Sequence, residues 1–285
     1  MKTMIRKLIN SIGYDINRIP KDEIDLYYKL YGKENVKNRR FYNIGTGSFR
    51  HSAWTNVDDK SNEHKNSNGI EWDLMSLAPI PLEDNCAEIV YSSHKVEHIT
   101  DPAAQNIFNE SYRILKKGGI FRVTTPNIDL YFRAYKENDR YFFYWIDYCS
   151  IPKNYKRVKL NKPLNEASIQ QIFLEEFATS ASTLYEDGAP ERITDDELDR
   201  VFQEMEYEDA LNYCISKCSV TVQKRYPEHH INWWNKNKMF RMLGIAGFEN
   251  INLSGYGQSF SPVLRNTWKF DNTNPKISLY VEAIK

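Results

Sequence analysis

The amino-acid sequence predicts an α/β fold, with a mainly parallel sheet covered by helices on both faces. From Arg40 onward, short apolar runs alternate with turn residues and with helical periodicity, a pattern typical of strand and helix units. Near Asn127 this alternation stops and a charged, aromatic stretch begins, which we interpret as a mainly helical insertion. The 285 residues, 41% of them hydrophobic, suffice for one such domain with a sizeable insertion.

Seven strands are expected, five before the insertion and two after it. They are Phe41–Ile44, Thr55–Val57, Gly69–Trp72, Ala87–Tyr91 and Ile120–Thr124, followed by Phe248–Leu253 and Ile277–Ala283. Apolar residues at helical spacing predict one helix over Ala104–Leu115, capped by Lys116–Gly119, and another over Asn235–Leu243. Inside the insertion, Thr194 and the three acidic residues after it indicate the start of a helix.

The chain therefore divides into three parts. Residues 1–39 form an N-terminal helical segment, residues 40–128 and 235–285 form the sheet domain, and residues 129–234 form the insertion. In the first part, Met4, Ile5, Leu8, Ile9 and Ile12 lie at helical spacing. This helix is expected to pack on the domain or on a second subunit, and a helix on a membrane surface is the alternative.

Composition excludes several classes of protein. Lys and Arg together number 38, as do Asp and Glu, so the chain lacks the net positive charge of proteins that neutralise nucleic-acid phosphates. No apolar run approaches the roughly 20 residues that span a bilayer. We expect a cytoplasmic protein with no nucleic-acid partner and no membrane span.

Small and acidic residues follow three consecutive predicted strands. The first strand leads into Asn43-Ile44-Gly45-Thr46-Gly47-Ser48, where the glycines let the backbone approach a ligand. Asp58 ends the second strand, where it could accept hydrogen bonds from ribose hydroxyls, and Asp73 and Leu74 follow the third, beside an adenine ring. Carboxyl ends of parallel strands share one sheet edge, which is where such sheets bind ligands. A helix is expected after the loop, shortened because Gly45 and Asp58 are close in sequence.

Five segments resemble the successive motifs of class I S-adenosylmethionine-dependent methyltransferases. They are FYNIGTGSFRHSAWTNVDD, WDLMSLAPIPLEDNCAEIVYSSHKVEHI, NESYRILKKGGIFRVTTPN, LGIAGFENINLSGYGQS and ISLYVEAIK. The resemblance covers roughly residues 40–128 and 235–285. It is nearest to small-molecule enzymes found among bacterial surface-polysaccharide genes.

The resemblance implies a Rossmann-like seven-stranded sheet whose final strand is reversed. It also implies S-adenosyl-L-methionine at the glycine loop, with S-adenosyl-L-homocysteine as the product. The residues expected to bind this cofactor are Asn43, Gly45, Thr46, Gly47, Ser48, Asp58, Asp73, Leu74 and Ser92. The chain departs from the family pattern in having Asn43 where an acidic residue is usual, and in lacking a third glycine near Ser48 and Phe49.

Methyl transfer to a hydroxyl needs alignment, a dry pocket and a base. His94 is the first choice for the base because it directly follows the fourth strand, and His98 and His229 are the alternatives. All three could instead be structural. Asp84, Glu97, His98 and His229 could in principle hold a divalent ion, but we assign no metal because the H-E-x-x-H order of zinc proteases is absent.

Two further stretches stand out, and the first lies in the insertion, which is expected to form one wall of the acceptor site. The insertion holds the densest aromatic cluster, which suits stacking on sugar faces but is more typical of a core or a dimer surface: Tyr131, Phe132, Tyr135, Tyr141, Phe142, Phe143, Tyr144, Trp145 and Tyr148. The stretch from Ser254 to Pro275 is longer than a hairpin loop requires, and such loops usually have a function.

The sequence therefore predicts a methyltransferase acting on a small-molecule acceptor. The resemblance favours a hydroxyl of a sugar or nucleotide-linked sugar in surface-polysaccharide biosynthesis, with the insertion as the acceptor-binding cap. A homodimer would fit the exposed aromatic and helical features. The alternative is a non-catalytic binding protein that retains the fold, while a nicotinamide dehydrogenase is disfavoured because Arg50 replaces the last glycine of G-x-G-x-x-G.

Overall fold

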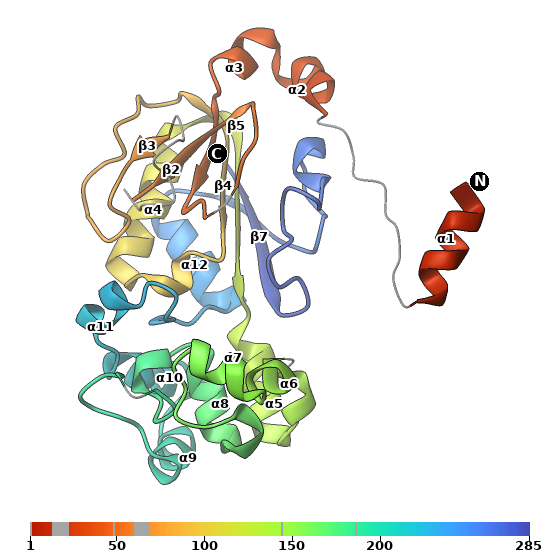
Figure 1. The fold of residues 1–285 in the computed structure, drawn as a ribbon. Coiled ribbons are helices and arrows are strands. Elements are labelled where there is room, and N and C mark those ends of the chain that lie inside the picture. Colours follow the sequence, from red (N-terminus) through yellow and green to blue (C-terminus); the bar gives the residue numbers. More distant parts are fainter. Residues whose placement is uncertain (1, 13–22, 48, 60–68, 144, 186) are drawn as a thin grey trace.

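The computed structural model describes residues 2–12, 23–47, 49–59, 69–143, 145–185 and 187–285. At its centre is one seven-stranded sheet with the strand order β3-β2-β1-β4-β5-β7-β6 (Figure 1). Strands β1 to β5 run parallel, while β7 runs antiparallel to both of its neighbours, β5 and β6. The predicted seven-stranded sheet with a reversed final strand is confirmed.

All seven strands lie close to their predicted positions. They are β1 (Phe41–Ile44), β2 (Trp54–Asp58), β3 (Ile70–Glu71), β4 (Ala87–Ser93), β5 (Leu115–Pro126), β6 (Asn250–Ser254) and β7 (Ser278–Ile284). The central strands β1 and β4 are buried almost throughout, as their unbroken apolar runs predict. Beyond the end of β5 the chain leaves the sheet and enters the helical segment.

One face of the sheet is covered by α4 (Asp101–Ile114) and α12 (Lys236–Ile245), whose apolar stripes join the main core. Helix α4 starts before the predicted Ala104, with Pro102 in its first turn. The predicted cap at Lys116–Gly119 is wrong, because α4 ends at Ile114 and β5 begins at the next residue. Pairing between β4 and β5 decides this, since Leu115 already pairs with Ala87 before a register shift.

The other face is covered by α2 (Ile24–Tyr31), α3 (Lys33–Lys37) and a short turn η6 (Pro262–Arg265). The helix expected after the glycine loop is not found among the described residues 45–47 and 49–53, which form turns and irregular backbone. The β1–β2 connection is too short for a crossover helix, which normally needs a dozen or more residues. Aromatic packing closes this face instead, with Phe49 against Trp54 and Phe270.

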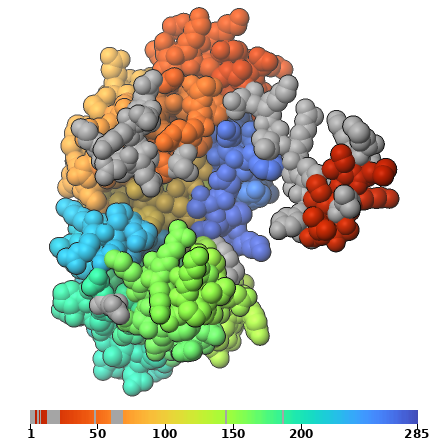
Figure 2. All heavy atoms as spheres, viewed as in Figure 1, coloured from red at the N-terminus to blue at the C-terminus, as the bar shows by residue number. Residues whose placement is uncertain are grey.

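Between β5 and α12 the chain forms a mainly helical segment with its own apolar core. Its helices are α5 (Ile128–Glu137), α6 (Trp145–Cys149), α7 (Pro152–Arg157), α8 (Ile169–Glu175), α9 (Asp195–Glu204), α10 (Tyr207–Ser216) and α11 (Val220–Arg225). In Figure 2 this segment is the green and teal lobe below the sheet domain. We call it the cap.

The two ends of the cap are tied together where the chain leaves and re-enters the sheet domain. The Ile128 amide donates to the Trp234 carbonyl at 2.9 Å, and the Asn127 amide donates to the Ile277 carbonyl at 2.8 Å. Within the cap, the predicted start of α9 is confirmed, since the Thr194 side chain accepts from the Glu197 amide. The aromatic cluster is split: Tyr131 and Phe143 are buried in the cap core, whereas Tyr141 is 99% exposed.

The expected N-terminal helix is present as α1 (Lys2–Ser11), drawn apart from the sheet domain in Figure 1. Its apolar residues Met4 and Ile5 are exposed, and so is Ile12 just beyond it. No described residue buries these three side chains, so the expected packing of this helix on the domain is not observed. Among the described residues, none of the helices is both long and apolar enough to cross a membrane.

Candidate active site

A cavity of about 750 Å³ opens at the carboxyl ends of β1 and β4, and we call it the sheet cavity. The glycine loop and the turn after β4 form one side of it, and the long C-terminal connection forms another. The residues from these segments are Asn43, Gly45, Thr46, Gly47, Phe49, Arg50, Tyr91, Ser93, His94, Lys95, His98, Trp268, Lys269, Asn272 and Thr273. The cavity therefore lies at the sheet edge predicted to bind the ligand.

Gly45 and Gly47 have left-handed backbone conformations, with φ of +72° and +48°. A Cβ atom on Gly45 would lie 2.2 Å from Cγ of Lys95, so the loop can pass under this side chain only because Gly45 lacks one. The Gly45 amide donates to the Val57 carbonyl at 2.9 Å, which continues the β1–β2 pairing into the loop. The loop is thus held open toward the cavity.

Asp58 supports the glycine loop directly. Its Oδ2 accepts from the Thr46 amide at 2.6 Å and lies 3.2 Å from the Thr46 hydroxyl, while Oδ1 accepts from the Asp59 amide at 2.9 Å. Asp58 does not line the sheet cavity. In this structure its visible role is to position Thr46.

The other predicted binding residues lie around the cavity rather than in it. Asp73 is exposed and accepts from the Met75 amide at 2.8 Å, while Leu74 is buried in the sheet core. Ser92 is also fully buried, and its neighbours Tyr91 and Ser93 line the cavity instead, because side chains alternate along β4. Ser48 lies outside the described residues.

His94 lies in a left-handed conformation, with φ of +49°, immediately after β4. Its Nδ1 is 3.1 Å from Oε1 of the buried Glu97, and its Nε2 is 2.7 Å from the Ser278 hydroxyl. Ser278 has one proton to share between Nε2 and the carbonyls of Thr273 and Asn274. His94 is therefore oriented by a carboxylate on one side while its other nitrogen faces a hydroxyl.

Glu97 is 1% exposed, and Thr125 donates to its Oε2 at 3.1 Å. Burial alone would raise the pKa of Glu97, but the neighbouring His94, with smaller contributions from His98 and His230, lowers it to about 2. Glu97 is consequently an anion across the physiological range. Its Oε1 accepts no well-aligned hydrogen bond despite its closeness to His94.

His98 meets His230 where the cap joins the sheet domain. The two rings make an edge-to-face contact with centroids 4.7 Å apart. Nδ1 of His98 is 3.2 Å from the His229 carbonyl oxygen, and Nδ1 of His230 is 2.7 Å from the Glu176 carbonyl oxygen. Burial, reinforced by the proximity of His230, lowers the pKa of His98 to about 3, so this ring is neutral.

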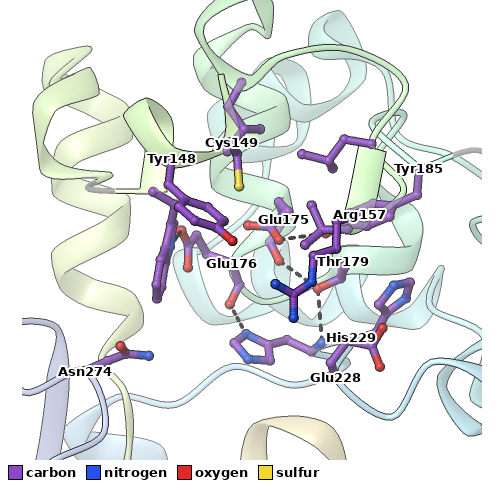
Figure 3. A pocket seen from close by; sticks show the side chains of 15 residues that line it. Tyr148, Cys149, Arg157, Glu175, Glu176, Thr179, Tyr185, Glu228, His229 and Asn274 are labelled. Atoms are coloured by element: carbon purple, nitrogen blue, oxygen red, sulfur yellow. Dashed lines mark hydrogen bonds between the residues drawn. The ribbon is translucent and has the colours of Figure 1, made fainter. Parts of the chain in front are cut away.

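A second cavity, of about 400 Å³, lies inside the cap, and we call it the cap cavity. Figure 3 shows Glu175 and Glu176 near its centre, between Tyr148 and Tyr185. Tyr185 donates to Glu175 at 2.8 Å, and the Trp145 indole donates to Glu176 at 2.9 Å. Burial raises the pKa of Glu175 and, together with the charge of Glu175, raises that of Glu176 well above its ordinary value.

The two cavities adjoin. Glu228 lines both of them, His98 lines the sheet cavity, and its partner His230 lines the cap cavity. His229 faces the cap cavity, with its ring stacked on Tyr226. A ligand in one cavity could therefore meet a ligand in the other beside these histidines.

The long connection between β6 and β7 forms part of the wall of both cavities. Its Trp268 and Asn272 line the sheet cavity, and its Asn274 lines the cap cavity. In Figure 2 this blue segment runs down to the green lobe of the cap. A fully buried ion pair anchors it: the Arg122 guanidinium donates to both oxygens of Asp271, with contacts of 2.6 to 3.2 Å.

Comparisons with known proteins agree with this geometry. Residues 48–123 match a family described as a methyltransferase domain. A stretch of 52 residues is 38% identical to a probable S-adenosylmethionine-dependent methyltransferase of Mycolicibacterium smegmatis, covering 18% of this chain and 20% of that protein. The match spans about a fifth of that relative's length. The family match falls on strands whose order in the sheet is that expected from the resemblance.

Residues 48–123 thus resemble a methyltransferase domain in sequence, and the sheet to which they belong has the strand order of a Rossmann-like methyltransferase fold. S-adenosylmethionine is the cofactor of this family. Solved structures with similar folds include a possible histamine N-methyltransferase of Thermotoga maritima, 10% identical over 100% of both chains with a TM-score of 0.39. Another is a methyltransferase of Mesorhizobium loti, 12% identical over 86% of this chain and 90% of that one, also with a TM-score of 0.39. Because both TM-scores are low, we assign the fold from the strand order of the sheet and not from these two structures.

The sheet cavity of the methyltransferase domain fits this cofactor. Its glycine loop leaves room for a close ligand, and Asn43, Arg50 and Lys95 line it. An asparagine oxygen can accept from the methionine amino group, and the cations suit the methionine carboxylate.

Sequence reasoning did not identify Arg50, Lys95, Glu175 or Glu176 as site residues. Lys95 adjoins the predicted base His94, so its position along the chain could have suggested it. Nothing local marks the two glutamates, because acidic residues in a helical stretch are normally solvated.

Proposed function

We propose that this methyltransferase domain transfers the methyl group of S-adenosylmethionine to a hydroxyl of a small, sugar-derived acceptor, leaving S-adenosylhomocysteine. The observation that carries the proposal is the pair of adjoining cavities. The sheet cavity is lined by the glycine loop and shares Glu228 with the cap cavity, and His98 of the sheet cavity contacts His230 of the cap cavity. Bound cofactor supplies an activated methyl group, and the protein supplies alignment and proton removal.

The lining of the cap cavity supports an acceptor with an uncharged, polyhydroxylated sugar part. Trp145, Tyr148 and Tyr185 offer aromatic surfaces, which pack against the apolar faces of sugar rings. Raised pKa values make Glu175 and Glu176 prone to be neutral carboxylic acids, which both donate and accept hydrogen bonds. This combination matches hydroxyl groups better than it matches an anion. Arg157, at the rim, is the group best suited to a phosphate of a nucleotide-linked sugar.

We assign residues 129–234 as the acceptor-binding cap and His94 as the base. Glu97 orients Nδ1 of His94, and an acceptor hydroxyl would take the place of the Ser278 hydroxyl at Nε2. In that arrangement Nε2 accepts the proton as the methyl group is transferred. The role in surface-polysaccharide biosynthesis and the cytoplasmic location rest on the sequence resemblance and composition.

Two measurements test the proposal. Isothermal titration should detect binding of S-adenosylmethionine and S-adenosylhomocysteine to the full chain, and mass spectrometry should detect transfer of label from the cofactor to sugar or nucleotide-sugar acceptors. Binding without transfer to any acceptor would favour a non-catalytic protein that retains the fold. Efficient methylation of bulk RNA or DNA, with none of any sugar-derived compound, would show the acceptor assignment to be wrong.

A further inference from the structure

Three side chains with metal-binding atoms converge where the two cavities meet. One ligand atom each from Glu97, His98 and His230 lies within 4.8 Å of the others. The set considered from the sequence was different: Asp84 instead pairs with Arg113 at 2.7 Å, and His229 faces the cap cavity. Of that set, Glu97 and His98 remain, and the third member, His230, comes from the far end of the cap.

The hydrogen bonds of His98 and His230 use Nδ1 of each ring and leave Nε2 available to a metal ion. Nδ1 of His98 and Nδ1 of His230 each face a main-chain carbonyl, at 3.2 and 2.7 Å, and therefore carry the ring proton. The lone pair of each neutral ring is then on Nε2. Metal-ligating histidines typically use this arrangement, because the carbonyl fixes both the tautomer and the ring orientation.

Glu97 supplies a negative charge, and its Oε1 is able to bind a further group. It is 1% exposed, and its Oε1 has no aligned hydrogen-bond donor although it is 3.1 Å from Nδ1 of His94. A buried anion without full hydrogen bonding is costly unless something compensates its charge. A cation between Glu97 and the two Nε2 atoms would do so.

The main chain around the cluster is held in place from both sides. The Ile231 amide donates to the Glu97 carbonyl at 2.9 Å, and Asn232 donates to the Ile99 carbonyl at 3.0 Å. Lys238, 2% exposed, donates to Asn232 at 2.7 Å and pairs with Asp101. These bonds fix the irregular segment that carries His230 beside the turn that carries Glu97 and His98.

From this geometry we propose that Glu97, His98 and His230 bind one divalent transition-metal ion of the zinc or cobalt type. Two imidazoles and one carboxylate suit such ions rather than magnesium or calcium, which prefer oxygen ligands. Three protein ligands leave a position open toward the cavities. If the proposed methyl transfer is correct, that position would hold a water molecule or a second oxygen of the acceptor, apart from the hydroxyl at Nε2 of His94. Ion binding itself does not depend on the acceptor.

The test is metal binding by the purified full chain, first stripped with a chelator. Cobalt(II) absorption spectra and zinc titration calorimetry should give one tight ion per chain, and zinc should raise the melting temperature because it binds only the folded state. His230→Ala and Glu97→Gln should each weaken binding at least tenfold. The matched control is His229→Gln, whose side chain lies outside the cluster and which should bind within about threefold of the wild type.

Circular dichroism and the melting temperature in chelator identify variants that fail to fold, and His98→Gln then replaces such a variant as the second ligand test. Absence of stoichiometric binding to the folded wild type would overturn the proposal. The proposal would also be overturned if every folded ligand variant bound the metal ion as strongly as the His229→Gln control. Loss of methyl transfer with intact ion binding would count against the proposed function but not against the metal site.

Discussion

Gly45 passes beneath the Lys95 side chain with a φ of +72°. Gly45→Ala should therefore weaken S-adenosylmethionine binding at least tenfold, because the new Cβ would overlap Cγ of Lys95 and shift the loop. Gly32→Ala is the matched control, since φ is +79° there but nothing lies within 4 Å of the added atom. Both variants incur strain of about 1 kcal/mol or more, visible in urea unfolding. Equal cofactor affinities in the two variants would contradict this account of the loop.

His94 is the residue on which the proposed proton transfer depends. His94→Asn should lower turnover about 10²-fold or more, since a positioned base contributes roughly 10²–10⁴-fold, while cofactor affinity stays nearly unchanged. Turnover, cofactor affinity and melting temperature are measured together for this variant and for His229→Gln. Full activity in His94→Asn would exclude it as the base, and a selective loss of turnover in His229→Gln would transfer the role to His229.

Two roles are open to the Asp58 carboxylate, namely binding the ribose of the cofactor and anchoring the glycine loop. The sequence predicts that it binds ribose, whereas the structure shows it holding the Thr46 amide and hydroxyl. Asp58→Ala should weaken cofactor binding by about 1–3 kcal/mol in either case. The stability of the cofactor-free protein separates them: a loss of similar size indicates a loop anchor, whereas unchanged stability indicates that the carboxylate serves mainly the ligand.

At the scale of elements, a buried ion pair between Arg122 and Asp271 holds the connection between β6 and β7. Arg122 and Asp271 are both fully buried, and Glu282 lies 3.6 Å from the same guanidinium. Removing one partner of a buried pair typically costs about 3–5 kcal/mol, and without Asp271 the Arg122 guanidinium would lose its bidentate partner and keep only the more distant Glu282. Asp271→Ala should lower the free energy of unfolding in denaturant by an amount of this order. The connection between β6 and β7 should also be less firmly held against the two cavities.

The matched control is Asp84→Ala, which breaks an exposed ion pair with Arg113 and should cost about 1 kcal/mol or less. Faster proteolysis within residues 255–277 of Asp271→Ala, and weaker cofactor binding, would link the ion pair to the cavity wall. A variant as stable and as protease-resistant as the control would show that the pair does not anchor this connection.

At the scale of the whole molecule, stability should fall on acidification. The pKa of His98 is lowered to about 3 in the folded chain, so between its ordinary value and pH 3 the unfolded chain binds a proton that the folded chain does not. Its contribution is complete above about pH 6.5 and is lost as the pH falls, by up to about 1.4 kcal/mol per pH unit. Glu97, with its pKa lowered to about 2, adds a further loss below about pH 4.5.

The measurement is the free energy of unfolding at pH 7 and pH 5, in chelator, for the wild type and His98→Asn. The wild type should lose more stability than the variant between these pH values. Comparing the two removes the opposite contribution of Glu175 and Glu176, whose raised pKa values favour the folded state at lower pH. Parallel pH profiles for the two proteins would mean that His98 does not titrate on unfolding.

The sequence by itself determined the sheet, because strand periodicity and turn residues are local signals that hydrophobic burial enforces. It also placed the glycine loop and His94 at the correct sheet edge, since parallel strands all end there. Only the tertiary structure decided which distant residues meet. The Lys95 side chain lies over Gly45, His230 from the end of the cap contacts His98, and Glu175 and Glu176 line a cavity inside the cap. Such encounters depend on how whole elements pack, and no local pattern of residue types encodes that packing.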